Sequence, residues 1–415
     1  MLVSILSFPT SARAEAAGLT LELAIEMATT QNEAARSASE RVKVAEAQVA
    51  RARAFLMPDV TVAGTITDQW GASNDTRRDA TRTGSVAIDL TLYDARSLPL
   101  YRQTQVARDA VVLDAEETRR LLAFATARAF ITVLGAEQVA AAAARRVGFA
   151  AANQADAEAR FEAGLVGSND VTRAELERVS AERSQIRADA SVLSGRLALG
   201  LLIVTEITGP LVIPAGLLDS VRDSTGDAPD GIPMDRKQAH ARRGDFAAAE
   251  KRAEALELAA REPTMRGRPR LNLTGEIKVD NEDRNAQQSL GLRLTWPLWD
   301  GGERKAEHAE RQALLAIGRL AVSALRREID TQVQSARVAM AAGQAEIGQA
   351  VRVVAAARRN SEETGVLYRE GLAAALAVTD ANVRLFEAEV EEARANYGAA
   401  AAFLDVRVAL GLDPL

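Results

Sequence analysis

The sequence predicts a mixed fold in which one unit, made of long antiparallel coiled-coil helices and a β-hairpin, occurs twice. Corresponding segments recur in the two halves of the 415-residue chain, offset by roughly 204 to 211 residues, far beyond the usual period of a solenoid repeat. Alanine supplies much of the hydrophobic share of 47%. Ala-, Glu- and Arg-rich sequence with helical period is typical of long helices or coiled coils. Four shorter segments alternate polar and apolar residues, as half-exposed strands do.

The repeated segments follow the same order in each half. GSVAIDLTLYDAR, from Gly84, corresponds to SLGLRLTWPLWDGG, from Ser289. ARFEAGLVGSNDV, from Ala159, corresponds to VLYREGLAAALAV, from Val366. Each half therefore predicts a helix, a β-hairpin, a very long helix, a break at a glycine and a returning helix.

This order divides the chain into four parts. Residues 1–14 resemble a secretory signal, because an apolar run precedes the small-x-small sequence that ends at Ala14; the alternative is a flexible N-terminus. The signal lacks a positively charged start, which suggests that translation begins further upstream. Residues 15–209 form the first repeat, 210–233 a linker rich in Gly, Pro and Asp, and 234–415 the second repeat.

Helical periodicity runs through most of both repeats. In the first helix, apolar residues recur at i, i+3, i+4 and i+7, and Pro58 ends the pattern. Gly164 and Gly371 interrupt the two longest helical segments. Helices of such length must pack side by side to be stable. The helices are predicted at about 19–56, 99–162, 170–202, 234–262, 303–370 and from the second glycine to about 410.

The predicted hairpins, at about 59–93 and 270–297, each have an apolar and a polar face. Val60, Val62 and Ile66 alternate with threonines, and Leu290 and Leu292 lie on the apolar side of the last strand. Two arrangements remain open at this point. The apolar faces pack on each other in a small soluble sandwich, or they meet lipid in an outer-membrane barrel.

The lipid arrangement requires several copies of the chain. Each strand has the length of a tilted transmembrane strand, about 9 to 11 residues. Four strands cannot close a barrel, and a membrane tolerates no open sheet edge, so three copies with twelve strands satisfy the requirement. Trp70 and Trp296 lie at strand ends, where interfacial aromatics are common, although a place in a core is the alternative for both.

Composition excludes several classes of protein. With no cysteine, the chain has no disulfide and no thiolate metal site. The net charge of -6, with both signs interspersed, argues against nucleic acid as a partner. The sequence contains no recognisable catalytic, phosphate-binding or metal-binding constellation, so we expect no enzyme and no cofactor. The sequence contains no run of about 18 apolar residues, so we expect no transmembrane helix.

The chain resembles the TolC-like family of outer-membrane efflux proteins over nearly its whole mature length. The resemblance rests on the opening LTLELAIEMATTQNEAARSASERVKVAEAQVARARAFLMPDV, the turn PLWDGG at residues 297–302, and the paired breaks FEAGLVGSNDV and LYREGLAAALAVTD. It implies a homotrimer with a twelve-stranded β-barrel in the outer membrane and a periplasmic α-helical tunnel. Such a duct serves a tripartite efflux pump or a type I secretion system, with a periplasmic adaptor and an inner-membrane transporter as partners.

The resemblance also assigns roles to the helix breaks. Gly164 with Leu165, and Gly371 with Leu372, match the family's tunnel-end turns, where the adaptor docks. Glycine suits a left-handed turn at such a place. A helical hairpin turn without any partner is the alternative.

Three further residues match the family's gate. Asp380 matches one of two aspartates that ring the periplasmic constriction, and the position of the other is Ala377. A ring of three carboxylates instead of six predicts weaker cation selectivity. Asp170 and Tyr368 match partners in the network that holds the closed state; the arginine expected beside the second tip is replaced by Ala373. The alternatives are a helix-start acid for Asp380, a helix cap for Asp170 or its neighbours, and simple packing for Tyr368.

We therefore expect a passive outer-membrane export duct that opens when an adaptor contacts the helix tips. A soluble periplasmic coiled-coil scaffold or adaptor subunit is the rival reading, since it shares the signal and the long helices. It leaves the four two-faced strands unexplained.

Overall fold

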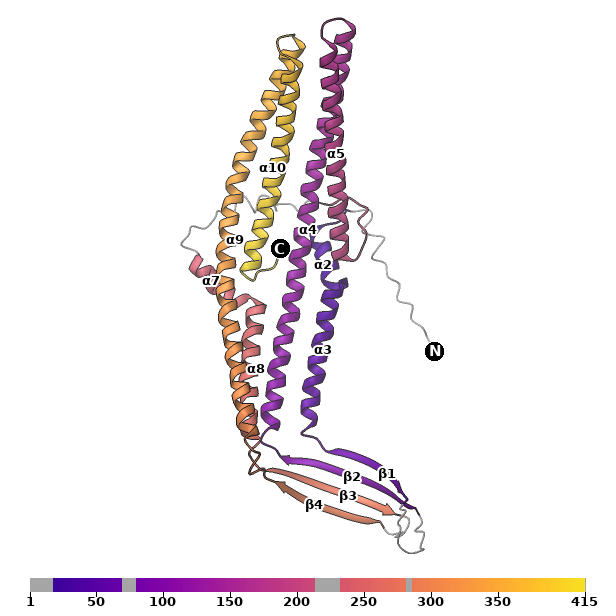
Figure 1. Cartoon of the computed structure of the whole chain (residues 1–415), viewed down its shortest axis with the longest axis vertical. Coiled ribbons are helices and arrows are strands. Elements are labelled where there is room, and N and C mark those ends of the chain that lie inside the picture. The colour runs from indigo at the N-terminus through magenta and orange to yellow at the C-terminus, as the bar shows by residue number, and fades with distance from the viewer. Residues whose placement is uncertain (1–17, 69–79, 213–231, 281–285, 415) are drawn as a thin grey trace. The chain divides into compact units, whose positions relative to one another are not determined.

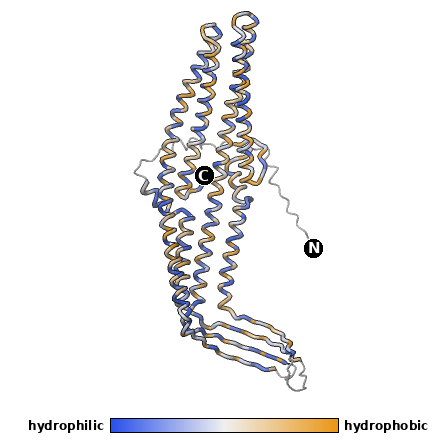
Figure 2. Tube along the Cα trace, in the orientation of Figure 1, coloured by the Kyte–Doolittle hydropathy of each residue, from blue (hydrophilic) through white to orange (hydrophobic). Residues whose placement is uncertain are grey.

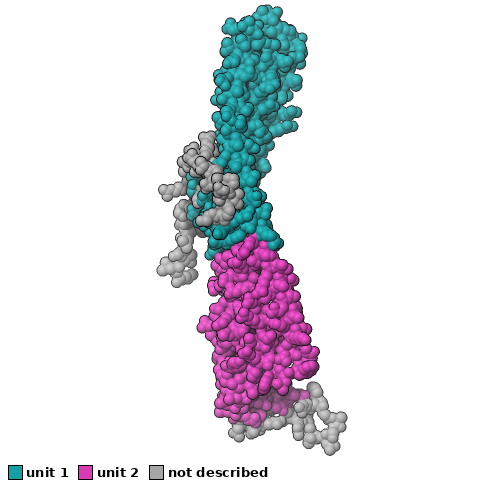
Figure 3. All heavy atoms as spheres, turned by 90° about the vertical axis from the view of Figure 1, so that its left-hand side faces the viewer, with its two compact units in different colours: residues 1–37, 116–243, 327–415 teal, residues 38–115, 244–326 magenta. Residues whose placement is uncertain are grey.

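A computed structural model describes residues 18–68, 80–212, 232–280 and 286–414 (Figure 1). The expected signal, Trp70 and most of the expected linker lie outside these ranges. The chain forms two compact units (Figure 3). Unit 1 contains residues 1–37, 116–243 and 327–415, and unit 2 contains residues 38–115 and 244–326. Each unit takes segments from both repeats, because the long helices pass through both units.

Unit 2 contains one four-stranded antiparallel sheet in the order β1-β2-β3-β4. The strands lie within the two segments where alternation predicts them. Pairing between β2 and β3 joins the two hairpins, and β1 and β4 remain as open edges. The strands are β1 (Asp59–Thr67), β2 (Thr81–Tyr93), β3 (Arg270–Asp280) and β4 (Gln287–Thr295).

The sheet has one apolar face that no other described part of the chain covers. Directly opposed residues on this face are apolar across the strands, as in the row formed by Leu90, Leu273 and Leu292. Val62, Leu290 and Leu292 are 67 to 79% exposed. Figure 2 shows hydrophobic and hydrophilic residues alternating along the strands. The soluble sandwich is therefore wrong, because the two hairpins pair edge to edge instead of face to face.

The opposite face of the sheet is polar. Asp89 pairs in register with Thr274, and Glu276 pairs in register with Ser289. The Nδ2 of Asn272 donates a hydrogen bond of 3.2 Å to Asp89. Two faces of opposite character on one exposed sheet suit a boundary between lipid and water.

The helices of unit 2 contain a cluster of ion pairs. Glu262 is 4% exposed and lies on α8 (Gly244–Met265). Arg266 lies 3.0 Å from Glu262 and 2.8 Å from Glu307, on the first part of α9 (Glu303–Arg369). Arg311 bonds Glu307 at 2.7 Å. The nearly buried carboxylate of Glu262 is stable because the guanidinium groups of Arg266, at 3.0 Å, and Arg311, at 3.7 Å, neutralise it.

Unit 1 contains two helical hairpins (Figure 1). The second part of α4 (Ser97–Glu162) pairs with α5 (Ser168–Ile203), and the second part of α9 pairs with α10 (Ala375–Ala409). A strict seven-residue spacing keeps one seam facing the partner helix. In the first hairpin this seam consists of buried alanines: Ala143, Ala150 and Ala157 on α4, and Ala174, Ala181 and Ala188 on α5.

The main core of unit 1 lies where these helices meet α2 (Leu21–Gln31). Larger side chains replace alanine there, and Phe130, Ile131 and Leu199 are almost fully buried. One 18-residue stretch of α4 reaches a mean hydropathy of 1.2 with at most two charged residues, and half of it is buried. By length and composition this stretch could cross a membrane, which differs from the expectation; its burial is that of a core helix.

Two predicted helices are interrupted. The first divides at Asn32 into α2 and α3 (Glu33–Ala54). The side chain of Asn32 accepts from the backbone N–H of Ala34 and donates to the carbonyl of Leu202, so it competes with the helical bonds. The second divides at Arg243 into α7 (Ile232–Arg242) and α8. Helix α8 also continues past Pro263 to its end at Met265.

Candidate functional site

Both helical hairpins of unit 1 end in the same turn. Gly164 has φ +70° and Gly371 has φ +75°. The N–H of Leu165 donates to the carbonyl of Arg160 at 2.8 Å, and the N–H of Leu372 donates to that of Leu367 at 2.8 Å. These bonds, with the positive φ, define a Schellman end, which favours glycine.

The turns leave a leucine at each tip. Leu165 is 73% exposed and Leu372 is 75% exposed. Exposed leucines in identical geometry at both tips form a matched pair of apolar contact points. No described residue of unit 1 covers them, so they are available to another molecule.

Arg160 links the two hairpins directly beside the tips. Its guanidinium carbon lies 4.4 Å from the centre of the Tyr368 ring, and its Nη2 donates to the carbonyl of Arg369 at 3.4 Å. Asp156, one turn earlier on α4, bonds the Nε of Arg160 at 3.1 Å. The arginine is thus oriented by a carboxylate on its own helix and stacked on a ring of the other hairpin.

Tyr368 is the buried member of this group. It is 6% exposed and packs with Ala375 and Val378, with Ala373 against the same cluster. Among the described residues its hydroxyl has no hydrogen-bond partner. Burial raises the pKa of Tyr368, Arg160 opposes this rise, and the carboxylates of Asp156 and Asp170 add to it. The phenol therefore stays neutral at physiological pH, and Arg160 faces an uncharged ring.

Asp170 does not cap its helix. Gly167 is the N-cap residue of α5, and no side chain makes a capping hydrogen bond there. Asp170 instead lies in the first turn, where a carboxylate interacts favourably with the helix dipole. The capping alternative is wrong because the chain is already extended at Gly167, three residues earlier.

Asp380 is exposed and paired. It lies on α10, and its Oδ2 is 2.8 Å from the Nε of Arg384; the two side chains are 57% and 67% exposed. Arg384 was not identified from the sequence. The spacing of four residues between opposite charges on a helix could have identified it.

Other arginines of α4 also reach the second hairpin. Arg145 bonds Glu389 at 2.8 Å, the guanidinium of Arg146 lies 5.0 Å from the centre of the Phe386 ring, and Arg128 pairs with Asp405. These contacts join α4 to α10 along its length. Among the contacts described between the hairpins, that of Arg160 lies nearest to both tips.

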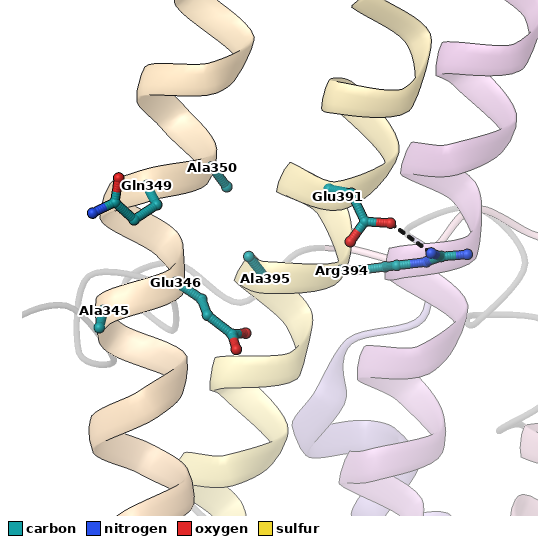
Figure 4. A pocket seen from close by; sticks show the side chains of 7 residues that line it. All are labelled: Ala345, Glu346, Gln349, Ala350, Glu391, Arg394 and Ala395. Carbon is teal, nitrogen blue, oxygen red and sulfur yellow. Dashed lines mark hydrogen bonds and ion pairs between the residues drawn. The ribbon is translucent and has the colours of Figure 1, made fainter. Parts of the chain in front are cut away.

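A shallow hollow separates α9 from α10 further from the tips (Figure 4). Its charged residues include Glu346 and the pair of Glu391 and Arg394, which lie 2.6 Å apart. No group of three metal-binding side chains occurs among the residues that the structure describes. The hollow is lined by Ala345, Glu346, Gln349, Ala350, Glu391, Arg394 and Ala395.

Comparison with solved structures shows the same fold in several outer-membrane channels. CusC has a TM-score of 0.85 at 16% identity, and the match covers 98% of this chain and 95% of CusC. VceC from Vibrio cholerae has a TM-score of 0.79 at 18% identity, with coverage of 95% and 97%. MtrE from Neisseria gonorrhoeae, in its open state, has a TM-score of 0.77 at 19% identity, with coverage of 95% and 90%.

The family model described as outer membrane efflux protein matches residues 24–203 and 236–412. A search among curated proteins gives no match. The family consists of outer-membrane channels and not of enzymes. This membership excludes the rival interpretation of a soluble periplasmic scaffold. Because its model covers most of both repeats, this chain belongs to the outer membrane efflux protein family, with its strands in the outer membrane and its helical part in the periplasm.

Proposed function

We propose that three copies of this chain close a passive exit duct, which a periplasmic adaptor opens and an inner-membrane transporter supplies. The single observation that carries the trimer is the sheet. It presents an uncovered apolar face and two open edges, at β1 and β4. An open edge is not tolerated in lipid, so the edges must pair with those of further copies. Three sheets of four strands give a twelve-stranded barrel.

An apolar stripe on α5 supports the same assembly. Its members recur at spacings of three, four and seven residues, the pattern of a coiled-coil seam. They lie opposite the alanine seam that packs on α4 and are 49 to 77% exposed. We call this set the α5 stripe: Leu176, Val179, Ile186, Leu193, Leu197 and Leu201.

A ring of copies requires a second, different surface to receive the α5 stripe. The outer side of α9 offers one, because it presents small apolar residues at i, i+3, i+4 and i+7. Large side chains on one helix and small ones on the other allow close packing. The receiving residues are Val338, Ala341, Ala342 and Ala345, all exposed in the single chain.

The closed state depends on Arg160 in this proposal. The family's arginine is absent at Ala373, which packs in the apolar cluster of the second tip. Arg160 supplies the positive charge from the first hairpin instead. Asp170 and Tyr368 complete the closing network, Asp170 through its charge and Tyr368 through its ring.

The tips are the proposed docking points for the adaptor. Leu165 and Leu372, presented by Gly164 and Gly371, offer it two matched apolar contacts. Adaptor contact would separate the hairpins and break the stacking of Arg160 on Tyr368. The chain contributes no energy source, so transport would be driven by the inner-membrane transporter.

Recording from the purified protein in planar lipid bilayers tests the duct. We expect discrete single-channel currents from the assembled protein. Absence of current under every condition, including variants that loosen the tips, would contradict the proposal. As a second readout, the barrel should keep the protein in the membrane pellet after extraction with alkali and urea.

A further inference from the structure

Charged side chains form a line along the exposed side of α10. Asp380, Arg384, Glu387, Glu391 and Arg394 recur at i, i+4, i+7, i+11 and i+14, and all are exposed. The opposite side of the helix is buried. A helix side with this row of charges suits a surface in contact with water.

The positive charges of this line are matched to individual carboxylates. Arg384 lies 2.8 Å from Asp380, and Arg394 lies 2.6 Å from Glu391. The hydrogen bond that Arg384 donates to Asp380 raises the pKa of Arg384, and the charge of Glu387 adds to this rise. Arg384 therefore keeps its charge throughout the physiological pH range.

We propose that Arg384 sets the ion selectivity of the duct, by cancelling the charge of Asp380 at the constriction. This inference rests on the proposed duct and on the resemblance that assigns Asp380 to the constriction, where three copies would bring three Asp380 side chains around the pore. An unpaired ring of carboxylates would concentrate cations.

Here the nearest opposite charge to each Asp380 carboxylate is the guanidinium of Arg384 in the same chain. Coulomb energy falls with distance, and carboxylates of different copies must stand further apart than 2.8 Å if a solute is to pass between them. The pair therefore controls the local field. The duct discriminates little between small cations and anions, and anionic solutes are not repelled.

The test is the reversal potential of the assembled protein in a KCl gradient. Arg384→Gln leaves Asp380 and Glu387 without their guanidinium, so the cation-to-anion permeability ratio should rise by about twofold or more. Asp380→Asn should lower the ratio. The double variant should return close to the wild-type ratio, because both members of the pair are then neutral.

Arg394→Gln is the matched control. It removes an equally exposed arginine from an equally close ion pair on the same line. It lies ten residues further along the helix, about 15 Å away, which exceeds the Debye length at physiological salt. We expect the permeability ratio to stay unchanged.

The outcomes separate this inference from the proposed function. Currents with an unchanged ratio in Arg384→Gln would overturn the role of Arg384 and leave the duct intact. An equal rise in both arginine variants would also overturn it, since the whole line would then set selectivity. No current from any variant would contradict the duct itself.

Discussion

Arg160 connects the first hairpin to the second within one turn of both tips. Its side chain stacks on Tyr368 and is held by Asp156. We propose that this contact takes the place of the arginine that the resemblance leads us to expect beside the second tip, where the chain has Ala373.

Replacing Arg160 by alanine should favour the open duct. Loss of a cation–π contact costs about 0.5 to 2 kcal/mol, which shifts a closed–open equilibrium by roughly 2- to 30-fold. The open probability of single channels measures this shift. Arg178→Ala is the control, because Arg178 bonds Gln154 and Glu182 within the first hairpin only. Equal open probabilities in both variants would contradict the role of Arg160.

The two tip glycines should each resist substitution. Gly164→Ala or Gly371→Ala places a side chain at positive φ, which costs about 1 to 2 kcal/mol although no atom lies within 4 Å of the new Cβ. Gly348→Ala is the control, since Gly348 lies inside α9 and also has open space. There alanine should stabilise the helix by up to about 1 kcal/mol. Urea midpoints compare the three variants; a tip variant as stable as Gly348→Ala would refute the argument.

At the scale of single elements, α5 has two apolar seams of different composition. Alanines face α4, and the larger residues of the α5 stripe face outward. An outward seam of leucine and isoleucine is costly in water unless another helix covers it. We therefore propose that α5 forms part of the interface between copies.

Charges in the α5 stripe should break the assembly. Ile186→Asp or Leu193→Asp forfeits about 1.5 to 3 kcal/mol of burial at each of three interfaces and adds a charge there. Size-exclusion chromatography in detergent should then show smaller species. Ser191→Asp, on the same helix but off the stripe, should elute like the wild type. Unchanged elution of both stripe variants would remove α5 from the interface.

The two faces of β4 should respond oppositely to arginine. Leu292→Arg puts a charge on the lipid-facing side, at a cost of about 2 to 4 kcal/mol near the bilayer centre. Ser289→Arg lies on the polar side of the same strand, opposite Glu276, and should be tolerated. The yield of urea-resistant protein after refolding into lipid vesicles compares them. Similar yields would show that the sheet does not face lipid.

Periodicity predicted these elements well where packing repeats regularly. The alternation of β1 and the alanine heptads of α4 are local signals, so the strands and long helices could be placed from sequence. The break at Asn32 could not be, because it depends on a hydrogen bond to Leu202, far along the chain. Arg160 was missed for the same reason, since its partner Tyr368 belongs to the other repeat. Arg384 could have been identified from the sequence, because its partner Asp380 lies one helical turn away.

At the scale of the whole molecule, duplication gives each chain two hairpins of strands and two of helices. Family membership shows that the chain is an outer membrane efflux protein. The tips suggest where a partner protein binds. In the proposed trimer, the exposed tip leucines, one per repeat, would give three chains six contact points of matching geometry.

Removing both leucines should uncouple the duct from its pump. The double variant Leu165→Ser, Leu372→Ser should lose adaptor-dependent efflux in cells and keep its single-channel currents, because neither side chain supports the fold of its hairpin. Leu176→Ser, near the tip on α5 but in the α5 stripe, should weaken the assembly instead. Normal efflux by the double variant would show that the adaptor docks elsewhere.

The account depends most on three copies closing one duct. Native mass spectrometry of the protein extracted in mild detergent measures the number of copies directly. We predict a single dominant species with three chains, reduced to monomers by Ile186→Asp. A wild-type protein that is monomeric or dimeric in the same detergent would contradict the account, because four or eight strands from this sheet would then have to close the barrel.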